Sequence, residues 1–419
     1  MIKTYCKIIG VSIILMTSLS PLQAQFNLPF AENYPDANSE IGIEADYFIS
    51  SDAVTVEFQN TYLSDNFIDN DLKDESFGKM DDRAVLGSGL NGGFYFKKKI
   101  SNKENKSWFA AAKVRQHYNS NFTTDMFGLY FYGNKRYAGQ KADLSDLNYL
   151  DIQYNQLQFG FNSAKLKDSS RWDFSYGASL LLGQEYLDIS SGRGSFYTHP
   201  EAEYVEMDIA LKSKQSDTTN TGFGAVNGIG ASFDFMAQYT RDGKYHILFG
   251  IRDAGLIAWN NKSNSFEIDT LYHFEGIYIE SIFDSLFLDI KSEEEFSEGF
   301  KKNRKQESFS TMVPMTLEFA YGRILIPKKL TVWGSVNYMI NVDYTPLFQV
   351  KGDYYFSSRF MGGASIRYGG YAEFGAGLYI GADLGKGFIL HGGTSYVTGF
   401  VSPSSSTAQG ATAGFRKIF

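Results

Sequence analysis

The sequence contains little cysteine and little proline, and it has no long hydrophobic run beyond its first 24 residues. Of 419 residues, one is Cys and 8 are Pro. Because Cys6 stands alone near the N-terminus, a disulfide scaffold is excluded. No stretch of about 18 uncharged apolar residues follows Ala24, which excludes a transmembrane helix. The net charge of −8 excludes the basic surface that binds nucleic acid, so we expect no nucleic-acid partner.

Motifs for catalysis and metal binding are also missing. The five His show no HExxH spacing and no Ser sits in a GxSxG, so we predict no enzyme activity, no cofactor and no metal site. The run Gly87–Gly92 matches GxGxxG, but it leads into a strand-like aromatic run where dinucleotide binding needs a helix, which favours a chance match. The acidic loop 65–82 offers oxygen ligands for Ca²⁺, yet it lacks the EF-hand glycine, so a solvated surface loop is the favoured interpretation.

Aromatic residues and glycine are abundant instead. Aromatic residues make up 16% of the chain, and there are 41 Gly. The 28 Tyr and 36 Phe are spread evenly from end to end, which indicates one repeating architecture. From residue 330 to 343 the even positions are apolar and the odd positions are mostly polar. The segments 172–183 and 371–383 repeat this alternation. A period of two predicts β-strands.

These strands fit a membrane barrel better than a soluble β-sandwich, which would also alternate. The runs are about 10 residues long, their polar face is rich in Gly and charge, and aromatic residues gather at their ends. The last segment keeps Phe415 and Phe419 on one face, as in a terminal strand read by the outer-membrane assembly machinery. We therefore predict an all-β fold, a transmembrane antiparallel up-and-down β-barrel of about 14 strands with long extracellular loops and one short loop helix.

Connection lengths support this prediction. Short turns are expected on the periplasmic side at 327–329, 357–359 and 385–387. The long excursions 64–85, 118–151, 184–228 and 253–313 all fall on the opposite side, as in outer-membrane barrels. The first strand is placed at 53–62. The alternating segment 41–49 is either a further strand or part of a tail that folds into the lumen.

The N-terminus has the features of a cleavable signal peptide. Lys3 and Lys7 precede the apolar core Ile8–Met16, and Ala24 provides a small residue at the cleavage site. The predicted organisation is a signal peptide at 1–24, an N-terminal segment at 25–52 that is a candidate plug of the lumen, and the barrel at 53–419. The expected location is the outer membrane, with lipid, lipopolysaccharide and the barrel assembly machinery as partners.

Several short motifs resemble a known family. They are Phe131-Tyr132-Gly133-Asn134, Tyr137-Ala138-Gly139, Asp143-Leu144-Ser145, the segment 282–286 and the late Gly-rich hairpins. Together they look like an uncharacterised family of Bacteroidota outer-membrane proteins, a domain of unknown function. More distantly, the layout is similar to FadL-type transporters of hydrophobic compounds and to PorV-type barrels of type IX secretion. The resemblance implies location and fold, and no activity.

One loop segment breaks the β period. Apolar residues recur there at spacings of three and four, which predicts a short amphipathic helix. The face includes Ile282, Phe283, Leu286 and Phe287. Such a helix is either a lid or plug at the barrel mouth or a loop helix that packs on its own neighbours, and the second interpretation is favoured.

The alternation also predicts which charged residues face the lumen. The candidates are Lys113, Arg115, His117, Asp234, Arg252, Glu318, Arg367 and Glu373. Because both signs occur in similar number, a network of paired charges that stiffens the barrel is favoured over a polar path for an anionic solute.

Two functions remain open from the sequence. The first is a channel or transporter for a small, hydrophobic solute. The second is an interaction barrel that docks a secreted protein or secretion machinery through its extracellular loops. Transport is favoured slightly because barrels of this size commonly form channels.

Overall fold

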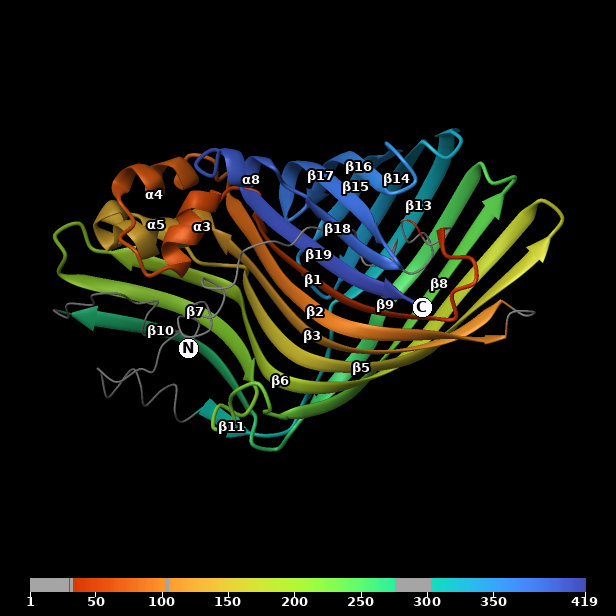
Figure 1. Cartoon of the computed structure of the whole chain (residues 1–419). Coiled ribbons are helices and arrows are strands. Elements are labelled where there is room, and N and C mark those ends of the chain that lie inside the picture. Colours follow the sequence, from red (N-terminus) through yellow and green to blue (C-terminus); the bar gives the residue numbers. More distant parts are fainter. Residues whose placement is uncertain (1–29, 31–32, 102–104, 276–302) are drawn as a thin grey trace.

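The computed structural model describes residues 30, 33–101, 105–275 and 303–419. Strands dominate this part of the chain, and all of them join one 19-stranded sheet (Figure 1). Fourteen of these strands form a closed wall, each antiparallel to the next. The wall strands are β1 (Ser39–Ser51), β2 (Arg83–Ser101), β3 (Lys106–Thr123), β5 (Leu147–Lys167), β6 (Ser170–Thr198), β8 (Gly228–Arg241), β9 (Tyr245–Trp259), β13 (Met315–Ile326), β14 (Leu330–Ile340), β15 (Thr345–Tyr355), β16 (Phe360–Gly370), β17 (Ala372–Gly385), β18 (Phe388–Thr394) and β19 (Ala408–Ile418).

The first and last strands close the barrel. Strand β1 pairs with β2 on one side and with β19 on the other, in an unbroken register from Glu40↔Ile418 to Ser50↔Ala408. Closure satisfies the backbone N–H and C=O groups along the whole wall, which a hydrocarbon environment requires. The predicted architecture, an antiparallel barrel of 14 strands, is confirmed.

The outer face of the wall carries a band of apolar side chains. On β5 the outward residues Leu157, Phe159 and Phe161 are 47%, 50% and 36% exposed. Polar residues follow on both sides, with Asn155 toward one end and Ser163 toward the other. An apolar band bounded by polar side chains around a closed barrel suits a lipid bilayer.

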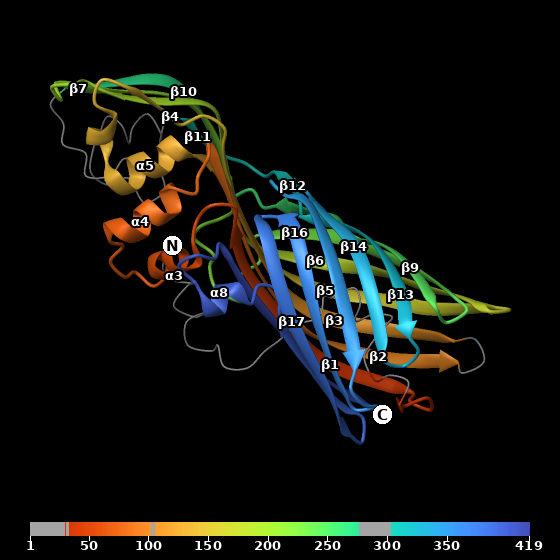
Figure 2. The ribbon, with the colours of Figure 1, turned by 90° about the horizontal axis from the view of Figure 1, so that it is seen from above.

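The two ends of the barrel differ in the length of their connections. At one end, which we call the turn end, the connections are as short as 168–169, 327–329 and 386–387. The opposite end, the loop end, carries the long connections and the helices (Figure 2). The predicted asymmetry between short turns and long loops is present.

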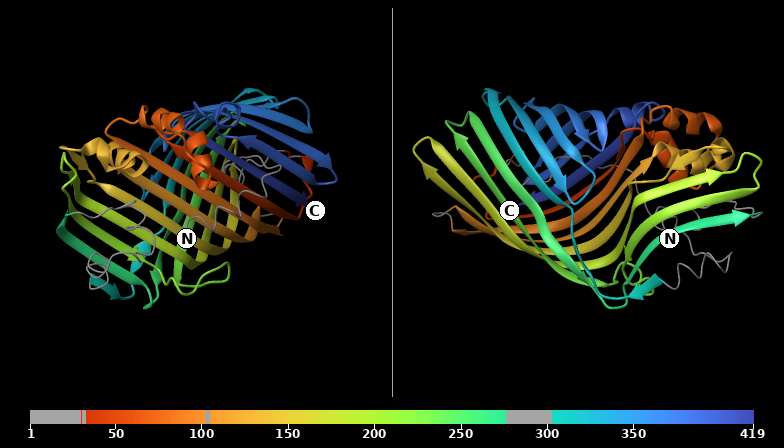
Figure 3. Two further views of the ribbon diagram at one scale, coloured as in Figure 1. Left: turned by 90° about the vertical axis from the view of Figure 1, so that its left-hand side faces the viewer. Right: turned by 180° about the vertical axis from the view of Figure 1, so that it is seen from behind.

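The loop end forms a folded layer of its own. It contains the helices α3 (Val56–Leu63), α4 (Asn70–Phe77), α5 (Thr124–Tyr132) and α8 (Thr398–Val401), the turn η2 (Asn134–Tyr137), and the short strands β4 (Lys141–Asp143), β7 (Tyr204–Gln215), β10 (Asn264–Glu275), β11 (Arg304–Gln306) and β12 (Ser310–Met312). Strand β6 continues beyond the wall and pairs there with β7, which pairs with β10. A core that includes Leu129, Phe196 and Ile209 holds this layer together. Figure 3 (left) shows the layer from the loop end.

Two sequence predictions about strands are wrong. Residues 53–62 do not form a strand, because the Thr55 side chain accepts a hydrogen bond from the Phe58 N–H and caps helix α3. The first strand is instead the segment 39–51, so the barrel begins within the stretch predicted as an N-terminal segment. The second wrong prediction concerns the excursion 253–313. Strand β9 continues into it and ends only at Trp259. Among the described residues, no helix combines the length and hydrophobicity needed to cross a membrane.

Candidate functional site in the barrel lumen

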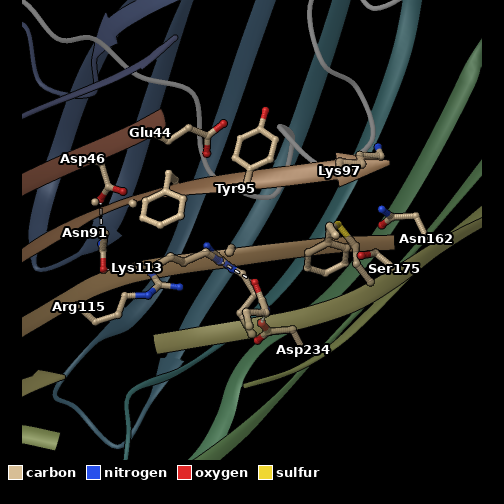
Figure 4. A pocket seen from close by; sticks show the side chains of 18 of the residues that line it. Glu44, Asp46, Asn91, Tyr95, Lys97, Lys113, Arg115, Asn162, Ser175 and Asp234 are labelled. Atoms are coloured by element: carbon tan, nitrogen blue, oxygen red, sulfur yellow. Dashed lines mark hydrogen bonds between the residues drawn. The ribbon is translucent and has the colours of Figure 1, made fainter. Parts of the chain in front are cut away.

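The lumen contains two cavities, one toward each end of the barrel. The inner cavity, nearer the turn end, has a volume of about 120 Å³ and is lined by residues such as Glu44, Tyr95 and Lys97 (Figure 4). The outer cavity, nearer the loop end, has a volume of about 240 Å³. The two cavities share the lining residues Asp46, Asn91, Arg115 and Arg252. These four residues therefore mark the level at which the cavities meet.

A belt of hydrogen-bonded polar side chains crosses the lumen at this level. Arg115 on β3 is its centre: its guanidinium donates to Asp253 Oδ2 at 3.1 Å, Gln156 Oε1 at 3.1 Å and Asn91 Oδ1 at 3.0 Å. Asn91 in turn donates to Asp46 Oδ2 at 2.9 Å. These bonds connect β1, β2, β3, β5 and β9, so the belt ties distant parts of the wall together.

The turn-end side of the belt continues with a second cation. Lys113 donates to Gln158 Oε1 at 2.9 Å, and Gln158 donates to Asp234. Figure 4 shows Lys113 and Arg115 on neighbouring inward positions of the same strand, with Asp234 across from them. Opposite charges and amides thus alternate around the belt, which offsets the cost of placing ions in a confined interior.

A β-bulge supplies two of the charged side chains. Along β8 and β9 the pairing shifts between Phe233↔Ala254 and Phe235↔Ile251, so two residues of β9 lie opposite Asp234. Asp253 has a positive φ of 57° there, and its N–H donates to Asp234 Oδ1 at 2.5 Å. Because a bulge inserts one residue, consecutive side chains, Arg252 and Asp253, both line the lumen.

Several aromatic rings line the outer cavity. Phe48 and Tyr371 are stacked with ring centres 6.1 Å apart, and Tyr344 meets Tyr371 edge-on at 4.9 Å. His117 Nε2 lies 2.8 Å from the Tyr371 hydroxyl oxygen, and the two rings are 6.0 Å apart. Aromatic pairs in these orientations are stabilising.

The inward face of β2 makes room for these rings. A Cβ at position 87 would lie 2.2 Å from the Tyr371 ring, and one at position 89 would lie 2.5 Å from the Phe48 ring. Only glycine fits such an approach. The Gly87–Gly92 run, which as a nucleotide motif looked like a chance match, therefore has a packing role in the lumen.

The structure places seven of the eight predicted lumen residues on cavity walls. The inner cavity is lined by Lys113, Arg115, Asp234 and Arg252, and the outer cavity by Arg115, His117, Arg252, Glu318 and Arg367. Glu373 is the exception. It lies near the loop end of β17, is exposed, and lines neither cavity.

Sequence reasoning missed three inward residues of β1, namely Glu44, Asp46 and Phe48, because the first strand was placed at 53–62. The signal was available in the alternation of Ile41, Ile43, Ala45 and Tyr47 with these positions. No sequence pattern indicated that Asp253 faces the lumen, because a bulge interrupts the period of two there.

The predicted loop helix with Ile282, Phe283, Leu286 and Phe287 lies outside the described residues, and so does the signal peptide. Part of the N-terminal segment is described. Phe30 is 6% exposed and packs inside the turn end of the barrel against Met361, Ile389 and Ile418.

Two polar contacts fix the same segment to β17. Asn33 Nδ2 donates to Asp383 Oδ2 at 2.8 Å, and the Tyr34 hydroxyl donates to Asp383 Oδ1 at 2.7 Å. Burial and the bond to Asp383 raise the pKa of the Tyr34 hydroxyl. The segment therefore covers part of the inner wall at the turn end.

Groups that could hold a metal ion are absent from the part of the chain that the structure describes. The chemistry of the lumen is therefore that of paired charges, amides and aromatic rings.

Several solved structures have a similar fold. The structure of "TodX deltaS2S3 mutant monoaromatic hydrocarbon channel" has a TM-score of 0.50 and 7% identity, with 96% of each chain covered. The toluene transporter TodX of P. putida has a TM-score of 0.46 and 9% identity, with 96% of each chain covered. A FadL homologue of Pseudomonas aeruginosa has a TM-score of 0.43 and 10% identity, covering 94% of this chain and 91% of that one. At 7% identity, the similarity to the TodX mutant concerns the fold alone.

No protein of curated function is similar enough to the chain to count as a relative. A family model does match, over residues 22–390, which is most of the chain. The chain belongs to the family of unknown function DUF5723.

Proposed function

We propose that the protein is an outer-membrane channel that carries small, hydrophobic solutes through its lumen. The observation that carries this proposal is the arrangement of the two cavities, which meet at the belt and share four lining residues there. The side chains of the belt lie at that level, so a route along the barrel axis would require them to rearrange. The apolar exterior and the closed wall support placement in a bilayer.

The location and orientation are part of the same proposal. A signal peptide cleaved after Ala24 would deliver the chain to the periplasm, where the assembly machinery inserts barrels. The short connections of the turn end would then face the periplasm, and the helices of the loop end would face the exterior next to lipopolysaccharide. In this orientation Phe30, Asn33 and Tyr34 would lie at the periplasmic mouth.

Solute uptake tests the channel. The full mature chain is reconstituted into liposomes, and uptake of toluene and glucose is compared with uptake into empty liposomes. We expect toluene to enter faster than into empty liposomes and glucose to enter at the rate of empty liposomes. Uptake of toluene that equals that of empty liposomes would contradict the proposal.

A belt variant sharpens the test. The double substitution Arg115→Ala and Asp253→Ala removes the central cation and its carboxylate together, which should widen the constriction and raise uptake severalfold. The matched control is Lys212→Ala with Glu267→Ala, which removes an exposed ion pair of 2.9 Å at the loop end. Equal uptake by the belt variant, the control and the unmodified protein would show that the belt does not limit passage.

A second candidate function is docking of a partner protein at the loop end. The folded layer of helices and strands favours it, because Phe67 and Phe223 are 88% and 76% exposed there. Two results together would favour this candidate over the channel. Liposomes that contain the protein would take up no more solute than empty liposomes, and the intact loop end would capture a secreted protein.

A further inference from the structure

Two arginines that line the outer cavity lack the ion pairs that Arg115 and Lys351 make. Arg115 is paired with Asp253, and Lys351 lies 3.0 Å from Asp353. Arg252 and Arg367, by contrast, have no carboxylate within ion-pair distance among the described residues. Their Nε groups are buried and find no hydrogen-bond acceptor in that part of the chain.

Burying a guanidinium Nε–H without an acceptor costs free energy, which a bound anion would recover. The Arg367 guanidinium also hydrogen-bonds to the Tyr396 side chain, so only part of its hydrogen-bonding capacity is met. The two arginines come from distant strands, β9 and β16, and both line the outer cavity together with Tyr344. Glu318 and Asp46 also interact electrostatically with Arg252, beyond ion-pair distance, so the local charge suits a ligand with one negative charge rather than two.

Aromatic rings lie beside these arginines. The Arg367 guanidinium is 5.1 Å from the centre of the Tyr396 ring, and Tyr344 packs edge-on against Tyr371. Tyr371 in turn stacks with Phe48. A small aromatic ring can therefore lie beside these side chains while its substituent reaches the two guanidinium groups.

The size of the cavity limits the ligand. A dry cavity of roughly 150 Å³ accepts a benzene molecule. The outer cavity, at about 240 Å³, has room for one ring with a small substituent.

We propose that the outer cavity binds a small aromatic monocarboxylate, with its ring beside the half-buried side chains of Phe48 and Tyr344 and its carboxylate between Arg252 and Arg367. The inference deepens the proposed channel by naming the class of solute that the cavity selects. It relies on the channel only for passage, because binding can be measured without transport.

Calorimetric titration of the full mature chain in detergent tests the site. The probes are benzoate, benzyl alcohol, which keeps the ring but has no charge, and benzylamine, which carries the opposite charge. We expect benzoate to bind at least tenfold more tightly than either. Equal affinity for benzoate and benzyl alcohol, or no binding of benzoate at millimolar concentration, would overturn the proposal.

Variants locate the site. Arg252→Gln and Arg367→Gln should each weaken benzoate binding at least tenfold and leave benzyl alcohol binding within twofold. Arg193→Gln, at an exposed arginine of the loop end, is the matched control and should change neither. Should a glutamine variant fail to fold, the comparison of the three probes on the unmodified protein still decides the question. An equal loss in Arg193→Gln and Arg252→Gln would contradict the assignment.

The outcomes separate this inference from the channel itself. Toluene uptake by liposomes without benzoate binding would overturn the carboxylate site and leave the channel standing. Benzoate binding without uptake of any solute would support the site and contradict the channel.

Discussion

Individual glycines of β2 decide how closely the aromatic rings approach the wall. A side chain at position 87 would overlap the Tyr371 ring, so the ring would have to leave its stack with Phe48. At Gly334, on the outward face of β14, nothing lies within 4 Å of an added Cβ. The two positions therefore form a matched pair for substitution.

We expect Gly87→Val to destabilise the barrel by about 1–3 kcal/mol, the usual cost of overpacking. Gly334→Val should change the free energy of unfolding by less than about 0.5 kcal/mol. Urea unfolding in lipid vesicles measures both. If the two variants lost similar amounts of unfolding free energy, the loss would come from valine in a strand and not from the contact with Tyr371.

The ion pair between Arg115 and Asp253 is buried, with side-chain exposures of 12% and 9%. Removing either partner leaves the other charge without compensation, so Arg115→Met and Asp253→Leu should each cost about 3–5 kcal/mol. The double variant should cost much less than the sum of the two. A double-mutant cycle from urea unfolding gives the coupling, and additive losses would show that the two groups act independently.

At the scale of elements, strand β1 is the part that sequence reasoning misplaced. The segment 53–62 contains β-branched residues and looked like a strand, whereas the cap by Thr55 and the burial of Phe58 against Phe127 favour a helix. Whether this segment forms a helix or a strand depends on tertiary contacts, which the periodicity of the sequence does not reveal. The wall strands from β2 onward were largely predictable, because each carries one apolar and one polar face.

The inward charges were predictable for the same reason, but their partners were not. Alternation assigned Lys113, Arg115 and Arg367 to the lumen. Which acid meets which base depends on the tilt and register of strands on opposite sides of the barrel, and no local pattern encodes these. The bulge at Asp253 is a second case, since the extra residue is visible only once β8 and β9 are paired.

Cross-linking tests the placement of β1. Ala45 pairs with Ala413, whereas Ala411 lies two residues further along β19. Because the sequence has no cysteine beyond residue 6, no native cysteine there can form a disulfide with an introduced one. We expect Ala45→Cys with Ala413→Cys to form an oxidised cross-link, because directly opposite residues lie within disulfide distance.

Ala45→Cys with Ala411→Cys is the control and should cross-link weakly, because diagonal neighbours lie roughly 7–8 Å apart. The readout is the mobility of the unfolded chain on a denaturing gel with and without reductant. Equal cross-linking of the two pairs, or none in the first, would argue against the register of β1 on β19.

At the scale of the whole molecule, the apolar band is what commits the barrel to a bilayer. Phe159 lies at the centre of the band on β5, between Leu157 and Phe161. We expect Phe159→Lys to cost about 2–4 kcal/mol in vesicles, as for a lysine near the bilayer midplane. Phe67→Lys, in an 88% exposed position of the loop end, should stay within about 0.5 kcal/mol.

Folding titrations in vesicles of phosphatidylcholine measure both losses. If Phe159→Lys lowered the free energy of unfolding as little as Phe67→Lys does, the band would face water. The bilayer placement of the barrel would then have to be abandoned.

The hydrogen bonds between the two ends of the described chain have a consequence for biogenesis. The Asn38 N–H donates to the Phe419 carbonyl at 2.8 Å, and the Phe419 N–H donates to the Ser39 carbonyl at 2.9 Å. Strand β1 therefore stays unpaired on one edge until β19 is in place. A truncation that removes β19 would leave two unpaired strand edges, which are templates for pairing with other chains.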